Sequence, residues 1–168
     1  ILKKYTNINL PINDLVNLIG TRLVEVESVE SLAPKYKDVI IAKVIAVQKM
    51  DNSDQLSKVL IDDDAVVKDV ERNEDGFVQV VCGAPNVAAG QVVPVAVIGT
   101  KIYSKDGNSF DIKEAKIRGE VSQGMICAED ELGLSDDHGG IMVLHSEKFE
   151  VGKNFADYFE LTNDEVYE

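Results

Sequence analysis

Apolar and polar residues alternate through most of the middle of the chain, and a period of two is typical of a strand with one buried face. In the stretch 38–48 the apolar positions fall on one face and Lys43 falls on the other. The apolar positions of that face are Ile40, Ala42, Val44 and Ala46. Further stretches of this kind are 56–64, 76–83, 91–103 and 110–119. The pattern predicts five short strands.

Five short strands, each with an apolar and a polar face, predict a small closed sheet. The most economical candidate is the OB-fold, a five-stranded Greek-key barrel, and an SH3-like barrel or a small sandwich fits the same pattern. Pro94 lacks a backbone N–H and therefore predicts an edge position or an irregular start for its strand. We expect one residue per strand to be largely buried in the barrel: Val44, Val59, Val81, Val95 and Ile117.

Short helical segments flank the predicted barrel. Asn13 can cap a helix that stops near Gly20, and a strand-like segment follows at 23–30. Asn154 can cap a second short helix near the end of the chain. The apolar residues of that helix are Phe155, Tyr158 and Phe159. The predicted fold class is mainly β, with α+β character from these extensions. We divide the chain into an N-terminal segment that packs on the barrel (1–36), the barrel domain (37–150) and an exit segment (151–168).

The overall charge of the chain does not favour binding to polyanions. The sequence has 17 Lys and Arg against 30 Asp and Glu, a formal net charge of −13. A role in nucleic-acid binding therefore needs a local basic patch. Alternation along the stretch 110–119 brings Lys116 and Arg118 to the outer face together, where Lys43 can join them. OB barrels bind oligonucleotides on such a face, and a solvated strand face with internal ion pairs is the alternative.

Ser122 is the residue that most suggests catalysis, because it lies close to glycines. A nucleophile elbow requires Gly-x-Ser-x-Gly, and here Gly124 fits while Glu120 occupies the first glycine position. The two histidines, His138 and His145, have no evident relation to Ser122. The pattern disfavours a serine hydrolase, so we predict no catalytic residue.

The sequence contains no recognisable signature for a metal or a nucleotide. The acidic stretches 51–54 and 62–64 lack the glycine and glutamate of a calcium-binding loop, and 135–140 offers no zinc pattern. Cys82 and Cys127 lie in apolar settings and are expected to be buried free thiols. No apolar run is long enough to span a bilayer, and we predict no contact with a membrane.

Two stretches of the chain carry the motifs of a known family. VVCGAPNVAAGQVVPVAVIGT, followed by IKEAKIRGEVSQGMICAEDELGL, resembles the tRNA-binding OB domain of the bacterial phenylalanyl-tRNA synthetase beta subunit. The segments 1–20 and 25–29, GIMVL at 140–144 and the closing LTNDEVYE are similar to the flanks of that domain. The matched positions are Cys82, Gly83, Ala84, Pro85, Asn86, Val87, Gly90, Pro94, Ala96, Gly99, Arg118, Gly119, Ser122, Gly124, Met125, Cys127, Glu131, Leu132 and Gly133.

The resemblance implies an accessory domain of a phenylalanine–tRNA ligase, a cytoplasmic enzyme of protein biosynthesis. The domain would contribute to tRNA binding or to subunit positioning and would be noncatalytic alone. Its partners would be tRNA, the alpha subunit and the remainder of a longer beta subunit that is shortened here at both ends. ATP and Mg²⁺ would be cofactors of the parent enzyme, and none is expected in this fragment. The alternative is a free-standing tRNA-binding or chaperone-like OB protein, which a reading frame ending at Glu168 would favour.

The loop at 50–56 departs from the family pattern. The family usually has His-Pro-x-Ala-Asp-Lys/Arg-Leu there, whereas this chain has Asp51 in place of the proline and Gln55 in place of the cation. This exchange predicts weak tRNA binding. The candidate nucleic-acid-binding residues are Lys43, Lys116, Arg118 and Ser122.

The stretch 117–134 is interpreted mainly as a signature of the fold. Arg118 and Gly119 would end a barrel strand, and 122–125 would form a tight backbone crossing. A short helix would begin at 129–132. A second role as an RNA-facing edge is compatible with this interpretation.

Overall fold

The structure is a computed structural model that describes residues 10–22, 29–31, 36–51, 53–103, 109–145, 149–158 and 165–167. Its helices are α1 (Ile12–Arg22) and α2 (Phe155–Tyr158). Its longer strands are β2 (Val39–Lys49), β3 (Ser57–Asp62), β4 (Val78–Cys82) and β5 (Val92–Val97). Its three-residue strands are β1 (Val29–Ser31), β6 (Lys101–Tyr103), β7 (Ser109–Asp111), β8 (Ala115–Ile117), β9 (Glu120–Ser122), β10 (Gly124–Ile126) and β11 (Glu165–Tyr167).

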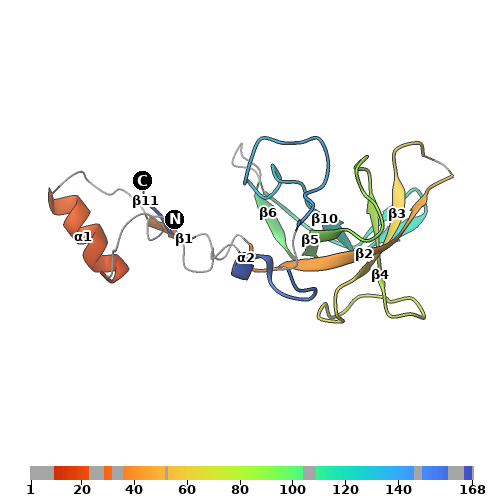
Figure 1. Cartoon of the computed structure of the whole chain (residues 1–168), viewed down its shortest axis with the longest axis horizontal. Helices are drawn as coiled ribbons and strands as arrows, with labels where there is room; N and C mark the ends of the chain where they lie inside the picture. Colours follow the sequence, from red (N-terminus) through yellow and green to blue (C-terminus); the bar gives the residue numbers. More distant parts are fainter. Residues whose placement is uncertain are drawn as a thin grey trace.

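Five strands form the main antiparallel sheet, in the order β10-β5-β2-β3-β4 (Figure 1). The two edge strands of this sheet, β4 and β10, approach each other. The N–H of Gln123, directly before β10, donates to the carbonyl of Gln79 in β4 at 3.0 Å. Two-stranded pairs β1–β11, β6–β7 and β8–β9 complete the described strands. Over the described residues the chain forms a nearly closed five-stranded barrel with two short helices, which confirms the predicted OB-like, mainly β fold class.

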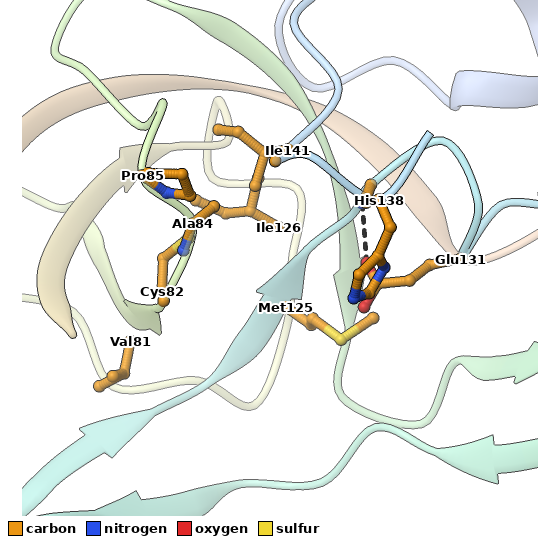
Figure 2. Close-up of a pocket in the computed structure, with 12 residues that line it drawn as sticks. Val81, Cys82, Ala84, Pro85, Met125, Ile126, Glu131, His138 and Ile141 are labelled. Carbon is orange, nitrogen blue, oxygen red and sulfur yellow. Dashed lines mark hydrogen bonds between the residues drawn. The ribbon is translucent and has the colours of Figure 1, made fainter. Parts of the chain in front are cut away.

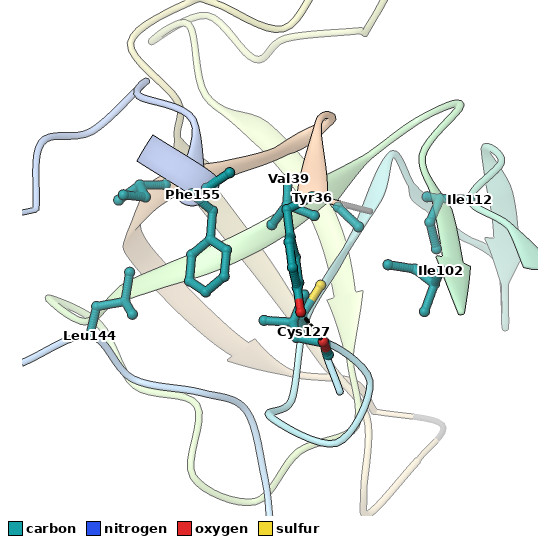
Figure 3. Close-up of a cluster of buried hydrophobic side chains, with 11 residues drawn as sticks. Tyr36, Val39, Ile102, Ile112, Cys127, Leu144 and Phe155 are labelled. Carbon is teal, nitrogen blue, oxygen red and sulfur yellow. Dashed lines mark hydrogen bonds between the residues drawn. The ribbon is translucent and has the colours of Figure 1, made fainter. Parts of the chain in front are cut away.

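Strand β2 supplies residues to two separate cores. Ala42 and Val44 point into the barrel, whereas Val39 and Ile41 point out of it, and all four are fully buried. The barrel core consists of Ala42, Val44, Val59, Ile61, Val78, Val80, Cys82, Val93, Val95, Ile126 and Ile141. The outer core consists of Tyr36, Val39, Ile41, Ala96, Ile102, Ile112, Cys127, Leu132, Leu144, Phe155 and Ala156 (Figure 3).

A β-bulge changes the alternation in the second half of β2. The register against β3 shifts between Val44 and Ala46, so Ala46 is exposed and Val47 packs against the barrel core instead. The predicted burial of Ala46 is therefore wrong. A bulge inserts one extra residue, which reverses the faces of every position that follows it.

The fifth strand of the barrel is not the one that the alternation predicts. Residues 110–119 contribute to β7 and β8, which pair outside the main sheet, and β10 takes the fifth place. Val44, Val59 and Val95 are buried as predicted, at 0%, 0% and 1% exposure. Val81 and Ile117 are only half-buried. Ile117 lies in the β8–β9 hairpin, outside the main sheet, which explains its incomplete burial.

Pro94 lies in β5, an inner strand of the sheet, so the predicted edge position is wrong. Its partner on β2 is Ile41, whose N–H donates away from β5 to the carbonyl of Lys153 at 2.9 Å. On the other side the carbonyl of Pro94 accepts from Cys127 at 3.0 Å, and the carbonyl of Cys127 accepts from Met142. These neighbours are satisfied without a proline N–H, which makes an inner position possible.

The helices agree with the prediction in existence and differ in detail. Helix α1 begins one residue before Asn13, with the carbonyl of Pro11 accepting from Leu15 at 3.0 Å, and it continues past Gly20 to Arg22. Asn13 is therefore not its cap. The predicted segment 23–30 overlaps β1 at its end, and its residues 23–28 lie outside the described residues, as does Phe159.

Helix α2 joins the exit segment to the outer core. The side chain of Asn154 accepts from the N–H of Ala156 at 2.9 Å, which confirms it as the cap. Phe155 is fully buried, and its ring lies 5.9 Å from that of Tyr36. The three-part division of the chain stays a prediction. No helix in the described part of the chain is long and apolar enough to cross a membrane.

Candidate nucleic-acid interface

Arg118 sits at the tip of a two-residue hairpin turn between β8 and β9. Ile117 pairs with Glu120, and the two residues between them have positive φ angles of 49° at Arg118 and 95° at Gly119. Positive φ at both central positions defines a type I′ turn, which favours Asn-Gly over Arg-Gly. The stretch therefore contains a turn where the sequence suggests the end of a strand. An arginine in this conformation is held at a cost of about 1–2 kcal/mol.

Arg118 and two lysines line one cavity of about 170 Å³. Lys49 is the last residue of β2, and Lys58 is near the start of β3. The register pairs Lys49 with Ser57 and Lys58 with Gln48, so the two lysines occupy successive positions along the same strand pair, and both line the cavity. The complete lining is Gln48, Lys49, Met50, Asp51, Lys58, Arg118 and Glu120. Three cations and two carboxylates therefore surround this space.

Glu120 is held at this cavity by hydrogen bonds from two strands. Gln79 Nε2 donates to one carboxylate oxygen at 3.0 Å, and Lys58 Nζ lies 3.3 Å from the other. The hydrogen bond from Gln79, followed by that from Lys58, lowers the pKa of Glu120. The carboxylate is therefore ionised and serves as the anion that Lys58 contacts.

The structure places the predicted site residues in different surroundings. Lys43 is exposed in the middle of β2, and Asp62 is its neighbour on β3. It precedes Lys49 by six residues, roughly 20 Å along a strand, so it does not join Arg118. Lys116 is exposed in β8, two residues from Arg118. RNA contact by these residues stays a prediction.

Ser122 is 3% exposed, and its hydroxyl is hydrogen-bonded between the backbones of β4 and β10. It accepts from the N–H of Val81 at 2.9 Å and donates to the carbonyl of Gly124 at 3.0 Å. A Cβ added at Gly124 would lie 3.0 Å from the carbonyl oxygen of Ala96, so the backbones cross closely here, as predicted. The surroundings of Ser122 are those of a structural residue, and its proposed RNA contact is untested.

Lys49 and Lys58 are the cations that the sequence reasoning missed. They flank the loop at 50–56, where the family pattern had already drawn attention to a lost cation at Gln55. Gln55 is exposed in that loop. The position of these lysines next to the loop could have marked them as candidate binding residues. Their proximity to Arg118 could not be predicted, because it depends on the placement of the β8–β9 hairpin.

Arg72 is used inside the protein. Its guanidinium contacts both carboxylate oxygens of buried Asp63, at 2.6 and 2.9 Å, and it also donates to the carbonyls of Val67 and Gly76. Burial by itself raises the pKa of Asp63, but hydrogen bonds from Arg72 and Val67 and the charge of Arg72 bring the pKa below its usual value. This pair organises the loop between β3 and β4.

A second cavity of about 300 Å³ opens beside the turn at 82–85 (Figure 2). Burial raises the pKa of the Cys82 thiol and also that of Glu131, whose carboxylate accepts from the N–H of Ala128 at 2.7 Å. A neutral thiol is a poor nucleophile, so this cavity offers no evident catalytic group. Residues 129–133 form turns where a short helix was predicted. Across the described ranges, no three His, Cys, Asp or Glu side chains converge to hold a metal ion.

Comparison with known proteins gives a family match that covers the barrel. Residues 39–154 match the family model described as "Putative tRNA binding domain". This range contains all five barrel strands. It also contains every residue that lines the cavity of Lys49, Lys58 and Arg118, called the basic cavity below.

Curated relatives are similar over most of the chain. The phenylalanine–tRNA ligase beta subunit of Chlorobium chlorochromatii (strain CaD3) is 48% identical over 136 residues, which cover 81% of this chain and 16% of the relative. That of Chlorobaculum tepidum is 44% identical over 161 residues, 95% of this chain and 18% of the relative. That of Bacteroides thetaiotaomicron is 40% identical over 170 residues, 99% of this chain and 19% of the relative. The chain thus spans less than a fifth of the length of each.

Proposed function

Because the chain belongs to the tRNA-binding domain family, we propose that it acts as an RNA-binding domain of a phenylalanine–tRNA ligase beta subunit. The observation that carries this proposal is the family match over 39–154, which spans the complete barrel. The beta-subunit relatives at 40–48% identity support the parent enzyme. The RNA-facing surface would include Arg118, with Lys116 beside it in the same hairpin.

In this proposal the domain binds or positions tRNA and performs no chemistry. ATP and Mg²⁺ would act in another part of the ligase, and the partners would be the alpha subunit and the rest of a cytoplasmic enzyme. The buried hydroxyl of Ser122 and the raised thiol pKa values of Cys82 and Cys127 support this assignment, because none of these groups is an activated nucleophile. Phenylalanine-dependent exchange of pyrophosphate into ATP by the purified chain would contradict it.

Titration of fluorescently labelled tRNA(Phe) into the chain tests the proposal. We expect weak binding that falls with added salt, because only a few cations face a protein of net charge −13. Charge reversal of both Lys116 and Arg118 to Glu should abolish the binding while leaving the thermal melt nearly unchanged, since both side chains are exposed. Binding that survives the reversal would assign RNA recognition to another surface. No binding by the wild type at low salt would contradict the RNA-binding role.

A further inference from the structure

The basic cavity has the cations of an anion-binding site, and the carboxylate of Glu120 already contacts one of them. Its cations belong to the end of β2, to β3 and to the β8–β9 turn. Its volume of about 170 Å³ equals roughly six waters of liquid density, which is room for a phosphate group. Glu120 contacts Lys58 from the wall of this space. A chain of net charge −13 thus gathers three cations at one concave place.

The contact between Lys58 and Glu120 is one that a phosphate can replace. The two side chains are 30% and 38% exposed, and ion pairs in such surroundings are weak. If Lys58 turned to another anion, Gln79 would still donate to the carboxylate of Glu120. The exchange would therefore break one weak pair and leave no buried carboxylate without a partner.

The turn conformation supports a binding role for Arg118. The type I′ turn places it at the tip of the hairpin, over the cavity that Lys49 and Lys58 reach from the sheet. Residues kept in a disfavoured backbone conformation cluster at binding sites. A guanidinium can also donate two parallel hydrogen bonds to one phosphate.

We propose that this cavity binds one backbone phosphate of RNA through Lys49, Lys58 and Arg118, and that Glu120 is an internal competitor which occupies Lys58 until the phosphate arrives. The choice of RNA as the source of the phosphate rests on the proposed function. The exchange of a carboxylate for a phosphate rests only on the geometry of the cavity. Asp51 at the rim adds a second opposing charge and keeps the affinity low.

Removal of the competitor tests the proposal by a gain of binding. Glu120→Gln keeps the size of the side chain and should tighten tRNA(Phe) binding about three- to tenfold at low salt. Glu114→Gln is the matched control, because it removes the same charge from an exposed position outside the cavity. Arg118→Gln should weaken binding more than Lys101→Gln, an exposed lysine in β6. Thermal melts verify that each variant is folded.

The outcomes separate this inference from the proposed function. Wild-type binding with equal gains for Glu120→Gln and Glu114→Gln would overturn the internal competitor and leave the RNA-binding role intact. If no variant binds tRNA, the RNA-binding role fails, and a second readout still decides the site. Inorganic phosphate should then shift the backbone amide resonances of Arg118 and Gly119 further in Glu120→Gln than in Glu114→Gln. Equal or absent shifts would overturn the phosphate site.

Discussion

At the scale of the residue, Ser122 and Arg72 use their polar side chains to hold the fold together. The hydroxyl of Ser122 joins β4 to the backbone that leads into β10, through Val81 on one side and Gly124 on the other. The guanidinium of Arg72 donates to the carboxylate of Asp63, directly after β3, and so fixes the loop between them. Both residue types are common in active sites, and only their partners show that they serve structure here.

Replacement of Ser122 by alanine should destabilise the chain without affecting any chemistry. The variant leaves the N–H of Val81 and the carbonyl of Gly124 each without its hydroxyl partner, at a cost of about 1–3 kcal/mol. Urea denaturation should show a lower midpoint with an unchanged slope, and ester hydrolysis should stay at background. Ser109→Ala, at an exposed position in β7, is the control and should change stability by less than about 0.5 kcal/mol. Equal stability of the two variants would contradict the structural role.

The Asp63–Arg72 pair should make the free energy of unfolding depend on pH in the acid range. Because the pKa of Asp63 is lower in the folded chain than in the unfolded one, its contribution is complete above the unfolded value, about 3.9, and is lost as the pH falls further. Asp63→Asn should cost about 3 kcal/mol at neutral pH, because it breaks a buried pair. Its loss of stability below pH 4 should be smaller than that of the wild type. Parallel curves of stability against pH for the two proteins would contradict this assignment.

At the scale of the element, the sequence predicts strands well where burial has a simple period. Residues 38–48 cover β2 except for its last residue, Lys49, and residues 56–64 and 76–83 contain β3 and β4. Each of these strands places alternate residues in the barrel core over most of its length. Strand β10 was missed because it has three residues and begins with glycine, which is too short for any period to appear. The bulge in β2 and the inner position of Pro94 depend on partners far along the chain, so no local pattern contains them.

The β8–β9 turn should trade stability for binding. Arg118→Asn introduces the residue that type I′ turns favour and should stabilise the fold by up to about 1 kcal/mol. The same change removes the guanidinium from the basic cavity and should weaken tRNA binding severalfold. Denaturation and tRNA titration of one preparation measure both effects. A variant that is less stable, or that binds tRNA as well as the wild type, would show that the turn is not strained for binding.

At the scale of the whole molecule, the candidate site could be predicted only in part. The alternating pattern predicts that Lys43, Lys116 and Arg118 are exposed, and all three are exposed in the structure. The pattern gives no distances between strands. Lys43 lies near Asp62, and the cavity around Arg118 is completed by Lys49 and Lys58 from other strands. The hairpin of β8 and β9 is held against β4 by hydrogen bonds from Gln79 to Glu120 and Val121. This placement brings Arg118 to the two lysines, and it depends on the complete fold.

The salt dependence of tRNA binding should report how few cations take part. Each neutralised phosphate contributes about 0.7–0.9 to the slope of log K against log salt, so three contacts predict a slope near −2 to −3. Gln55→Lys restores a cation at the position where the family usually has one, in the loop that supplies Met50 and Asp51 to the lining of the basic cavity, and should steepen the slope by about one unit. Ser109→Lys, at an exposed position in β7, adds the same charge elsewhere and should leave the slope nearly unchanged. A wild-type slope steeper than about −5, or equal slopes for the two lysine variants, would mean that tRNA meets a broader surface than this cavity and its rim.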